Sequence, residues 1–471
     1  MRIDILPDEV LLEIFDNYKQ PSWLDKRGSE AWQSLVHVCR RWRNLIFESP
    51  RRLDLQLVCT PETRLKDTLD IWPAFPLIVR GTVDFDRSSS PSNTDNVIAA
   101  LGHVNRVRQV DLYLGHWQFD SVLAPMHVSF PELTDLWLFA LYDDALAIPD
   151  SFLGGSAPRL RSFTLTSIPF PGLPKLLLSA TQLVELHLYR IPRSGYISPI
   201  AMATLLSVSP SLETVSLRFR SPQSHLDGES QSLLPKKRFV FPALNHFRFK
   251  GVTEYLEEIV TRIETPQIAE IDIYFFNETG FDCPRLAQFI NFTPILSNLD
   301  EAHVQFGYSS ASVILRYRTT KSDFNELRNN VPSRDRDWQP RISSVVQICS
   351  SSLLPHVMIE DLYLKYRDWR PVSKIDAFEN NLWLELLLPF IAVKNLYLSR
   401  EFAADIAAAL RGLVGDRLTE VLPSLQNIYV EGLEPPGHFQ ENIGQFVAAR
   451  QLFGHPITIF DWDEDSKMKS M

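Results

Sequence analysis

The sequence predicts an α/β protein in two parts: a small helical module at residues 1–50 and an irregular solenoid of strand-and-helix repeats at residues 51–460. Three observations predict this fold class. Apolar residues recur at helical spacing between Pro7 and Phe47. One short strand motif recurs eleven times from Val107 onward. The chain has 471 residues, more than one compact core normally holds, which favours several domains or an extended array.

The first helix of the module is predicted to begin at Pro7. Proline suits this position because its missing N–H would have no partner there, and Asp8 and Glu9 follow where the helix dipole favours negative charge. A second helical stretch is predicted from Ala31 to Phe47, and Pro50 ends it. Each helix carries one apolar stripe: Val10, Leu11, Ile14, Phe15 and Tyr18 on the first, and Trp32, Leu35, Val38, Cys39, Trp42, Leu45 and Ile46 on the second.

Three short motifs in this module resemble the F-box. The pair Leu6-Pro7 opens the first helix, the pair Ile14-Phe15 stands near its end, and Val38-Cys39-Arg40-Arg41-Trp42 follows in the second helical stretch. The loop from Lys19 to Glu30 departs from the family pattern because it is long and lacks a leucine-rich middle segment. The string from Trp32 to Arg43, continued by Ser49-Pro50-Arg51-Arg52-Leu53, is similar to F-box proteins of mushroom-forming fungi.

The resemblance implies docking onto a Skp-type adaptor, which joins a cullin–RING ubiquitin ligase. Two short helices bury too little surface to be stable alone, so we expect both stripes to be exposed surface that a partner covers. The alternative is that the helices only cap the domain that follows. The residues expected to bind the adaptor are Leu6, Pro7, Val10, Leu11, Ile14, Phe15, Leu35, Val38, Cys39 and Trp42.

The solenoid is predicted from a motif with three apolar anchors, separated by two variable residues and then by one. Its instances begin at Val107, Leu133, Leu160, Leu183, Leu212, Leu244, Ile268, Leu299, Ile359, Val393 and Leu425. The spacing is 23 to 34 residues, with one gap of 60 that holds a degenerate repeat or an insertion. One strand per repeat at this period is typical of a leucine-rich-repeat-like solenoid, in which stacking buries the apolar faces. The alternative, a doubly wound sheet, would not repeat one strand motif so often.

The region from about 305 to 345 interrupts this period. Ser312 to Arg318 is predicted to be an extra strand that pairs as a hairpin with the strand near Val304. Residues 328–341 have little apolar content and are predicted to be an exposed loop. Residues 461–471 are predicted to be a polar tail.

The variable positions of each strand are expected on one open face of the sheet, where they form columns from repeat to repeat. The position between the last two anchors holds Asp111, Trp137, Thr164, His187, Ser216, Arg248, Asp272, His303, Tyr363, Tyr397 and Tyr429 in chain order. Three clusters are expected to contact a protein substrate, since exposed Tyr, Trp and Arg are enriched at binding hot spots. The alternative is that aromatic residues simply suit strands and are covered by the chain's own loops. The clusters are a ladder of Tyr363, Tyr397 and Tyr429, a basic patch of Arg218, Arg248 and Lys250, and an aromatic patch of Tyr113, Trp137 and Phe139.

Charge and composition argue against several classes of function. A net charge of −10, with only two short basic runs, argues against nucleic acid binding. The longest apolar run, Leu384 to Val393, is too short to span a membrane. No phosphate loop, metal-ligand spacing or catalytic motif occurs, so we expect no metal, no cofactor and no enzymatic site. Acidic pairs such as Glu257-Glu258 are expected to be solvated.

The expected function is that of a substrate receptor in a cullin–RING ubiquitin ligase, in which the helical module holds the adaptor and the repeats hold the substrate. The alternative is a non-ligase scaffold for protein–protein interactions. The four cysteines show no disulfide-like or metal-like spacing, which fits a reducing compartment and a cytoplasmic or nuclear location.

Overall fold

The computed structural model divides into two compact units, Met1–Tyr196 with Val208–Leu212 (unit 1) and Ile197–Ser207 with Glu213–Met471 (unit 2). The predicted loop from Lys19 to Glu30 and most of the predicted C-terminal tail lie outside the described residues. The structure describes residues 6–18, 31–50, 52–62, 68–69, 72–83, 92–115, 118–141, 147–171, 173–222, 238–276, 283–293, 299–307, 310–316, 326–332, 338–350, 359–367, 380–432 and 438–462.

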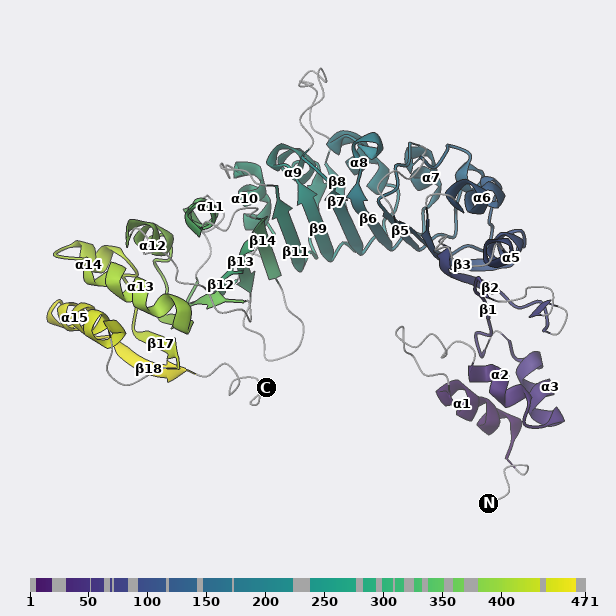
Figure 1. The fold of residues 1–471 in the computed structure, drawn as a ribbon, viewed down its shortest axis with the longest axis horizontal. Coiled ribbons are helices and arrows are strands. Elements are labelled where there is room, and N and C mark those ends of the chain that lie inside the picture. Colours follow the sequence, from purple (N-terminus) through teal and green to yellow (C-terminus); the bar gives the residue numbers. More distant parts are fainter. Residues whose placement is uncertain are drawn as a thin grey trace. The chain divides into compact units, whose positions relative to one another are not determined.

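The N-terminal module contains three described helices, α1 (Asp8–Tyr18), α2 (Ala31–Val36) and α3 (Arg40–Glu48), drawn in purple in Figure 1. The predicted single helix from Ala31 to Phe47 is therefore wrong. It breaks before α3, where Cys39 adopts an extended backbone with φ −157° and ψ 170°. Neither glycine nor proline marks this break, so periodicity alone could not reveal it.

Unit 1 continues with a parallel sheet whose strands follow chain order. The predicted anchors pair with one another across it: Leu136 on β4 is in register with Val110 on β3 and with Phe163 on β5. These anchors are buried, and the residues between them on β3 and β4 are at least partly exposed. The strands are β1 (Leu57–Cys59), β2 (Leu77–Val83), β3 (Val107–Leu114), β4 (Asp135–Ala140), β5 (Ser162–Thr166) and β6 (Glu185–Ile191).

The helical segments of unit 1 lie along one side of this sheet (Figure 1). Short 3-10 turns replace full helices in several repeats, which agrees with the irregular spacing of the motif. The segments are α5 (Ser92–Leu101), α6 (Phe119–Leu123), η4 (Ala124–His127), η5 (Phe152–Gly155), α7 (Leu173–Ser179) and η6 (Arg193–Gly195).

Unit 2 contains parallel strands on both sides of an antiparallel insertion. The insertion is a meander of β12 (Glu301–Phe306), β13 (Ser310–Arg316) and β14 (Glu326–Pro332). β14 pairs with β11 and β12 pairs with β15, so the chain enters and leaves the meander by crossovers that pass over two strands. The parallel strands are β7 (Thr214–Phe219), β9 (His246–Gly251), β11 (Glu270–Phe275), β15 (Asp361–Tyr366), β16 (Asn395–Leu398), β17 (Asn427–Glu431) and β18 (Thr458–Trp462).

The meander explains the gap of 60 residues and corrects part of its interpretation. The predicted hairpin is confirmed, because β13 pairs antiparallel with β12, although residues 317 and 318 lie outside the described part. The predicted loop at 328–341 is wrong at both ends: residues 326–332 form β14, and α11 begins at Trp338. Composition does not reveal this strand, because it forms by pairing with β11 and β13, which are distant in sequence or require the meander to fold.

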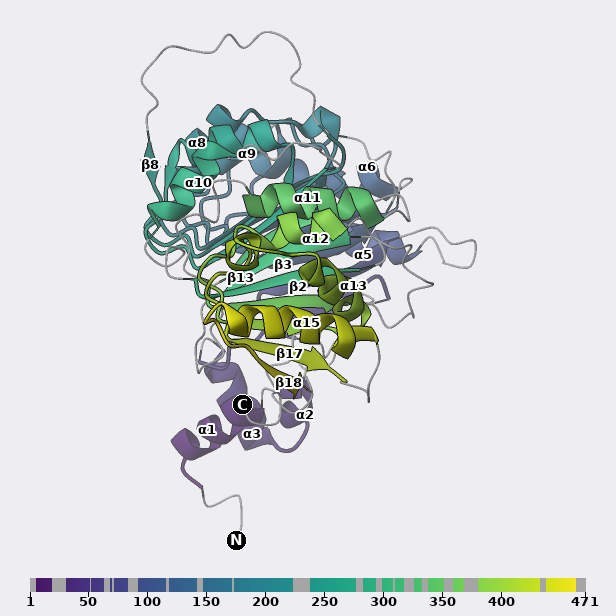
Figure 2. The ribbon, with the colours of Figure 1, turned by 90° about the vertical axis from the view of Figure 1, so that its left-hand side faces the viewer.

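The helices of unit 2 cover one face of its sheet, with α13 packed against α15 (Figure 2). α11 packs on β13 and β14, so the helical layer continues over the meander. A separate pair of short strands, β8 (Phe239–Val240) and β10 (Ile263–Glu264), is parallel. The helices are α8 (Pro199–Leu206), α9 (Thr253–Val260), α10 (Pro284–Asn291), α11 (Trp338–Ser350), α12 (Asn380–Leu387), α13 (Arg400–Arg411), α14 (Arg417–Glu420) and α15 (His438–Leu452).

Candidate functional site

The first helix of the module has two apolar faces with different environments. Leu11 and Phe15 are 0% and 2% exposed, so they belong to the core of the module. Val10 and Ile14, one turn apart on the other face, are 41% and 43% exposed, and Pro7 is exposed one turn before them. The predicted stripe is therefore split: only its Pro7, Val10 and Ile14 side presents a surface that a partner could contact.

The second predicted stripe is split in the same way. Leu35 and Trp42 are buried, whereas Val38 is 58% exposed in the turn between α2 and α3. The Trp42 ring meets the Phe15 ring edge to face at 4.8 Å between centroids, so two of the motif residues hold α1 and α3 together. The expectation that Leu11, Phe15, Leu35 and Trp42 are exposed for an adaptor is wrong, because the helices bury them against each other.

Arg41 joins the start of α3 to the start of α1. Its Nη2 lies 2.6 Å from Asp8 Oδ1 and donates a second hydrogen bond of 2.6 Å to the Leu6 carbonyl oxygen. Arg43 donates from Nε to the carbonyl oxygen of Val36 at 3.0 Å and ties α3 to the end of α2. Because these bonds bring the two helix starts together, Pro7 and the turn with Val38 lie at the same end of the module.

The other side of the module packs on the chain that leads into the first strands of unit 1. The Trp32 ring meets the rings of Trp72 and Phe75 edge to face at 5.1 and 5.4 Å. Phe47 packs on the same two rings, and Trp32 Nε1 donates to the Gln56 carbonyl oxygen at 3.3 Å. The module is thus anchored to the repeats through α2 and α3, while the exposed face of α1 is not part of this contact.

Comparison with family models matches residues 3–56 to the F-box-like family. The N-terminal module is an F-box-like domain. The match ends six residues beyond the predicted boundary at 50 and includes Gln56, which accepts the Trp32 bond. None of the curated proteins compared with the chain matches it. Among solved structures, the leucine-rich repeat-containing protein LegL7 from Legionella pneumophila is similar, with 13% identity and a TM-score of 0.27 over 80% of this chain and 98% of its own.

The open face of the repeats carries the predicted tyrosine ladder. The rings of Tyr363 and Tyr397 stack with centroids 4.1 Å apart, and those of Tyr397 and Tyr429 at 4.5 Å. The ladder is longer than predicted, because His303 stacks on Tyr363 at 4.3 Å and Phe460 on Tyr429 at 5.0 Å. The sequence does not predict the place of Phe460, because β18 carries no complete strand motif and its last two residues fall in the predicted polar tail.

Most of this ladder is not a free surface. Tyr363 and Tyr397 are only 3% and 5% exposed, and Trp462 packs on both rings at 6.1 and 5.5 Å. The expected substrate contact at Tyr363 and Tyr397 is therefore corrected: the chain itself covers them, as the alternative predicted, although the covering residue Trp462 lies on the strand β18 and not in a loop. Tyr429 is half-buried and Phe460 is 41% exposed, so only the end of the ladder is accessible.

A row of amides runs beside the ladder on the same face. Asn395 Nδ2 donates to Asp361 Oδ1 at 2.8 Å, and Asn427 Nδ2 donates to Asn395 Oδ1 at 2.8 Å. Each donor sits on the strand next to its acceptor, in register. The row ties β15, β16 and β17 together and shows that this part of the open face is internally bonded.

The predicted basic patch is a network of ion pairs. Arg218 lies 3.3 Å from Asp272, Arg248 lies 3.0 Å from Glu270, and the Lys250 ammonium stands 4.6 Å above the ring of Tyr274. Burial raises the pKa of Asp272 although the nearby arginines oppose the shift. In the predicted column His303 follows Asp272, but the two residues are not on neighbouring strands. The register partner of Asp272 is Arg328 on β14, and β13 lies between β14 and the strand of His303.

The third predicted cluster is confirmed as a set of neighbouring rings in unit 1. The Tyr113 ring lies 6.2 Å from that of Trp137 and 5.3 Å from that of Phe139. Trp137 is 42% exposed, so this cluster has an accessible ring on the open face. Asp111, which is in register with Trp137, forms an ion pair with Arg80 at 3.3 Å.

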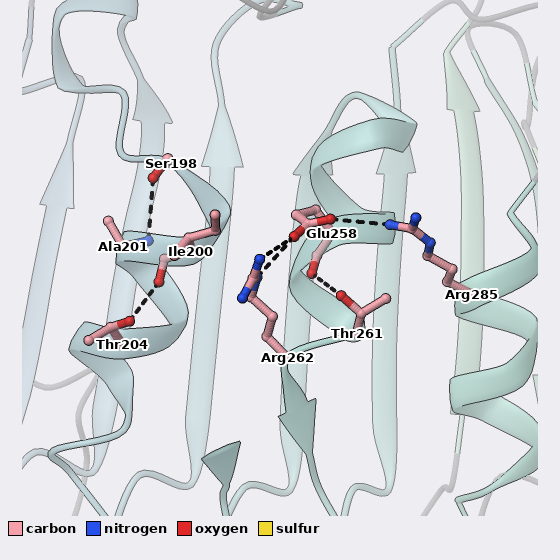
Figure 3. A network of polar contacts seen from close by, with 8 residues as sticks. All are labelled: Ser198, Ile200, Ala201, Thr204, Glu258, Thr261, Arg262 and Arg285. Carbon is pink, nitrogen blue, oxygen red and sulfur yellow. Dashed lines mark hydrogen bonds and ion pairs between the residues drawn. The ribbon is translucent and has the colours of Figure 1, made fainter. Parts of the chain in front are cut away.

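The acidic pair Glu257-Glu258 is not solvated as expected but joins α9 to α10. Glu258 accepts two hydrogen bonds from Arg262, at 2.9 and 2.7 Å, and one from Arg285 at 3.1 Å (Figure 3). Glu257 accepts the backbone N–H groups of Arg285 and Leu286 at 3.0 and 2.8 Å, which caps the start of α10. These carboxylates have a structural role that only the folded chain reveals.

Two further classes of site are absent from the described residues. That part of the chain contains no group of three or more His, Cys, Asp or Glu side chains placed to hold a metal ion. None of its helices is long and apolar enough to cross a membrane.

Proposed function

We propose that this protein is a substrate-receptor subunit of an SCF-type cullin–RING ubiquitin ligase. The F-box-like domain would dock a Skp-type adaptor, and the leucine-rich-repeat-like solenoid would bind a protein substrate. The observation that carries the proposal is the pair Val10 and Ile14, two apolar side chains more than 40% exposed on a helix whose other face is fully buried. Exposed apolar stripes of this kind mark protein-binding surfaces.

The proposed adaptor surface is narrower than the whole set of motif residues. It consists of Leu6, Pro7, Val10 and Ile14 on and before α1 and of Val38 and Cys39 before α3, all of which are exposed or half-buried. The buried motif residues act indirectly, because they hold these side chains in place. In such an assembly the receptor contributes proximity between a substrate and the ligase and needs no catalytic residue of its own. The chain would act in the cytoplasm or nucleus, where its four free thiols stay reduced.

Co-purification with a Skp-type adaptor and a cullin tests the proposal. The full chain is expected to retain both proteins, and the double variant Val10→Glu, Ile14→Glu is expected to lose them while its thermal unfolding is little changed. Val128→Glu is a matched control, since Val128 is a 52% exposed valine that directly follows η4, outside the F-box-like domain. A wild-type chain that is folded but retains neither adaptor nor cullin contradicts the proposal.

A non-ligase scaffold is the second candidate. The packing of Trp32 on Trp72 and Phe75 favours this candidate, because a contact of this kind is what helices that only cap the start of the repeats would need. The two candidates differ in one measurable respect. A cap requires only the buried side of the helices, so the double variant at Val10 and Ile14 would then change neither complex formation nor stability.

A further inference from the structure

The aromatic cluster of unit 1 lies next to a carboxylate on the open face. Asp111 and Tyr113 are two residues apart on β3, and Trp137 and Phe139 are their register partners on β4. These four side chains therefore form a block of two rows on neighbouring strands, which lie about 4.8 Å apart. We call this block the Asp111–Trp137 block. Its most exposed aromatic member is Trp137.

The carboxylate in this block is only partly compensated. Arg80 Nε lies 3.3 Å from Asp111 Oδ2, and about a quarter of the Asp111 side chain, 26%, is exposed. Asp111 Oδ1 is buried and accepts no hydrogen bond from the described residues. Burial raises the pKa of Asp111, and Arg80 offsets this shift only in part. Because Oδ1 is shielded from solvent, a donor from a partner would approach the exposed part of this side chain, where it would add to the ion pair with Arg80.

The surrounding rows of the sheet have an excess of negative charge. The row of Asp111 and the two rows beside it, across β2 to β6, contain one arginine, Arg80, and three carboxylates, Asp111, Asp135 and Glu185. The arginine and the carboxylates together leave an excess of two negative charges. Such a field attracts cations and repels acidic segments of a partner.

We propose that the Asp111–Trp137 block binds a basic side chain, arginine or lysine, of a protein partner. The cation lies over the exposed face of Trp137, with Tyr113 beside it, and its N–H groups face the Asp111 carboxylate. This inference rests on the proposed function, because it names the residue class by which the repeats hold their substrate.

The geometry favours a cation over the other possible occupants. A cation within about 6 Å of an indole centroid is attracted by the negative face of the ring. A cation above Trp137 would also lie beside Asp111, the register partner of Trp137 on the neighbouring strand. A purely apolar group would desolvate Asp111 further without giving it a donor. An acidic group would meet the excess negative charge of the three rows.

Peptide pools test the class of ligand directly. The probe is a library of randomised 15-residue peptides in four pools, in which the central residue is arginine, lysine, glutamine or glutamate. The full-length chain is expected to retain the arginine and lysine pools at least about fivefold more than the other two. Equal retention of all four pools, or a preference for glutamate, overturns the proposal.

Variants with opposite expected signs separate binding from misfolding. Asp111→Asn is expected to weaken binding of an arginine-pool peptide about fivefold, which corresponds to about 1 kcal/mol. Trp137→Ala weakens it by a similar factor, since the ring face is lost. Arg80→Gln is expected to strengthen it severalfold, because Asp111 loses its internal partner. Misfolding of this face would lower the affinity of all three variants, whereas the proposal requires Arg80→Gln to bind the peptide more tightly. Weaker binding by Arg80→Gln therefore contradicts the proposal.

Glu185→Gln provides the matched control, because it removes one negative charge from the same face but two strands away from Trp137. It is expected to change the affinity less than twofold. If Glu185→Gln weakens binding as much as Asp111→Asn does, the peptide is attracted by the overall negative charge of the face and not by a specific site. Adaptor co-purification is measured on the same variants. If the predicted changes in peptide binding do not occur but the adaptor complex still forms, this inference is wrong and the proposed function is not affected.

Discussion

The neighbouring residues Ile14 and Phe15 allow one substitution each that separates binding from folding. Both belong to the same F-box motif, and both are apolar. Phe15 is 2% exposed and packs on Trp42, whereas Ile14 is 43% exposed. We expect Phe15→Ala to unfold the F-box-like domain and Ile14→Ala to leave it folded but with weakened adaptor binding.

The magnitudes follow from burial. Truncating a buried phenylalanine to alanine costs about 3–5 kcal/mol through lost burial and the cavity left behind. A domain of this size is stabilised by roughly 3–8 kcal/mol in total, from about 0.05–0.15 kcal/mol per residue. The change at Phe15 is therefore comparable to the whole stability of the domain. The change at Ile14 is expected to be within about 0.5 kcal/mol, because an exposed side chain loses little on truncation.

Hydrogen exchange measured by mass spectrometry resolves the two effects. Amides of α1 and α3 are expected to lose protection in Phe15→Ala and to keep it in Ile14→Ala. Both variants should bind a Skp-type adaptor more weakly, the first because the surface is lost with the fold and the second because a contact is removed. Equal exchange in both variants would refute the assignment of Phe15 to the core and Ile14 to the surface.

Three further outcomes are expected. Glu257→Gln should weaken the cap at the start of α10 and lower the stability of unit 2 by about 1 kcal/mol, measured by chemical denaturation; an unchanged midpoint contradicts the capping role. Trp462→Ala should expose Tyr363 and Tyr397, seen as faster nitration of these rings by tetranitromethane, and equal rates would show that Trp462 does not cover them. Burial lowers the pKa of His303, so the unfolded chain binds more protons just below pH 6.5 and stability should fall as the pH drops from 7 through that lowered pKa; His303→Asn should remove this part of the pH dependence.

Much of the F-box-like domain could be predicted because its signals are local. Leu6-Pro7, Ile14-Phe15 and the residues around Trp42 identify it, and the family match to residues 3–56 bears this out. Which residues face outward could not be predicted, because one stripe of helical periodicity can face either a partner or another helix. The break at Cys39 and the bonds of Arg41 to Leu6 and Asp8 determine which side chains face outward. Both features exist only in the folded chain.

The solenoid shows the same division. The predicted anchors of successive repeats are in register, as between Leu362, Leu396 and Ile428. The order of the strands was not predicted at β14, which lies between β11 and β13 and is antiparallel to β13. A periodic motif reports which residues are anchors but not which strand lies beside which, so Asp272 was assigned the wrong neighbour.

By itself the sequence determined the domain type at the N-terminus, the repeat and its anchors, and the column that holds Tyr363, Tyr397 and Tyr429. These are properties of short segments, which propensity and periodicity record. Only the tertiary structure decided that Trp462 covers two of these rings and that Asp111 and Trp137 adjoin an accessible surface. Exposure depends on residues far away in the chain, and no local pattern contains that information.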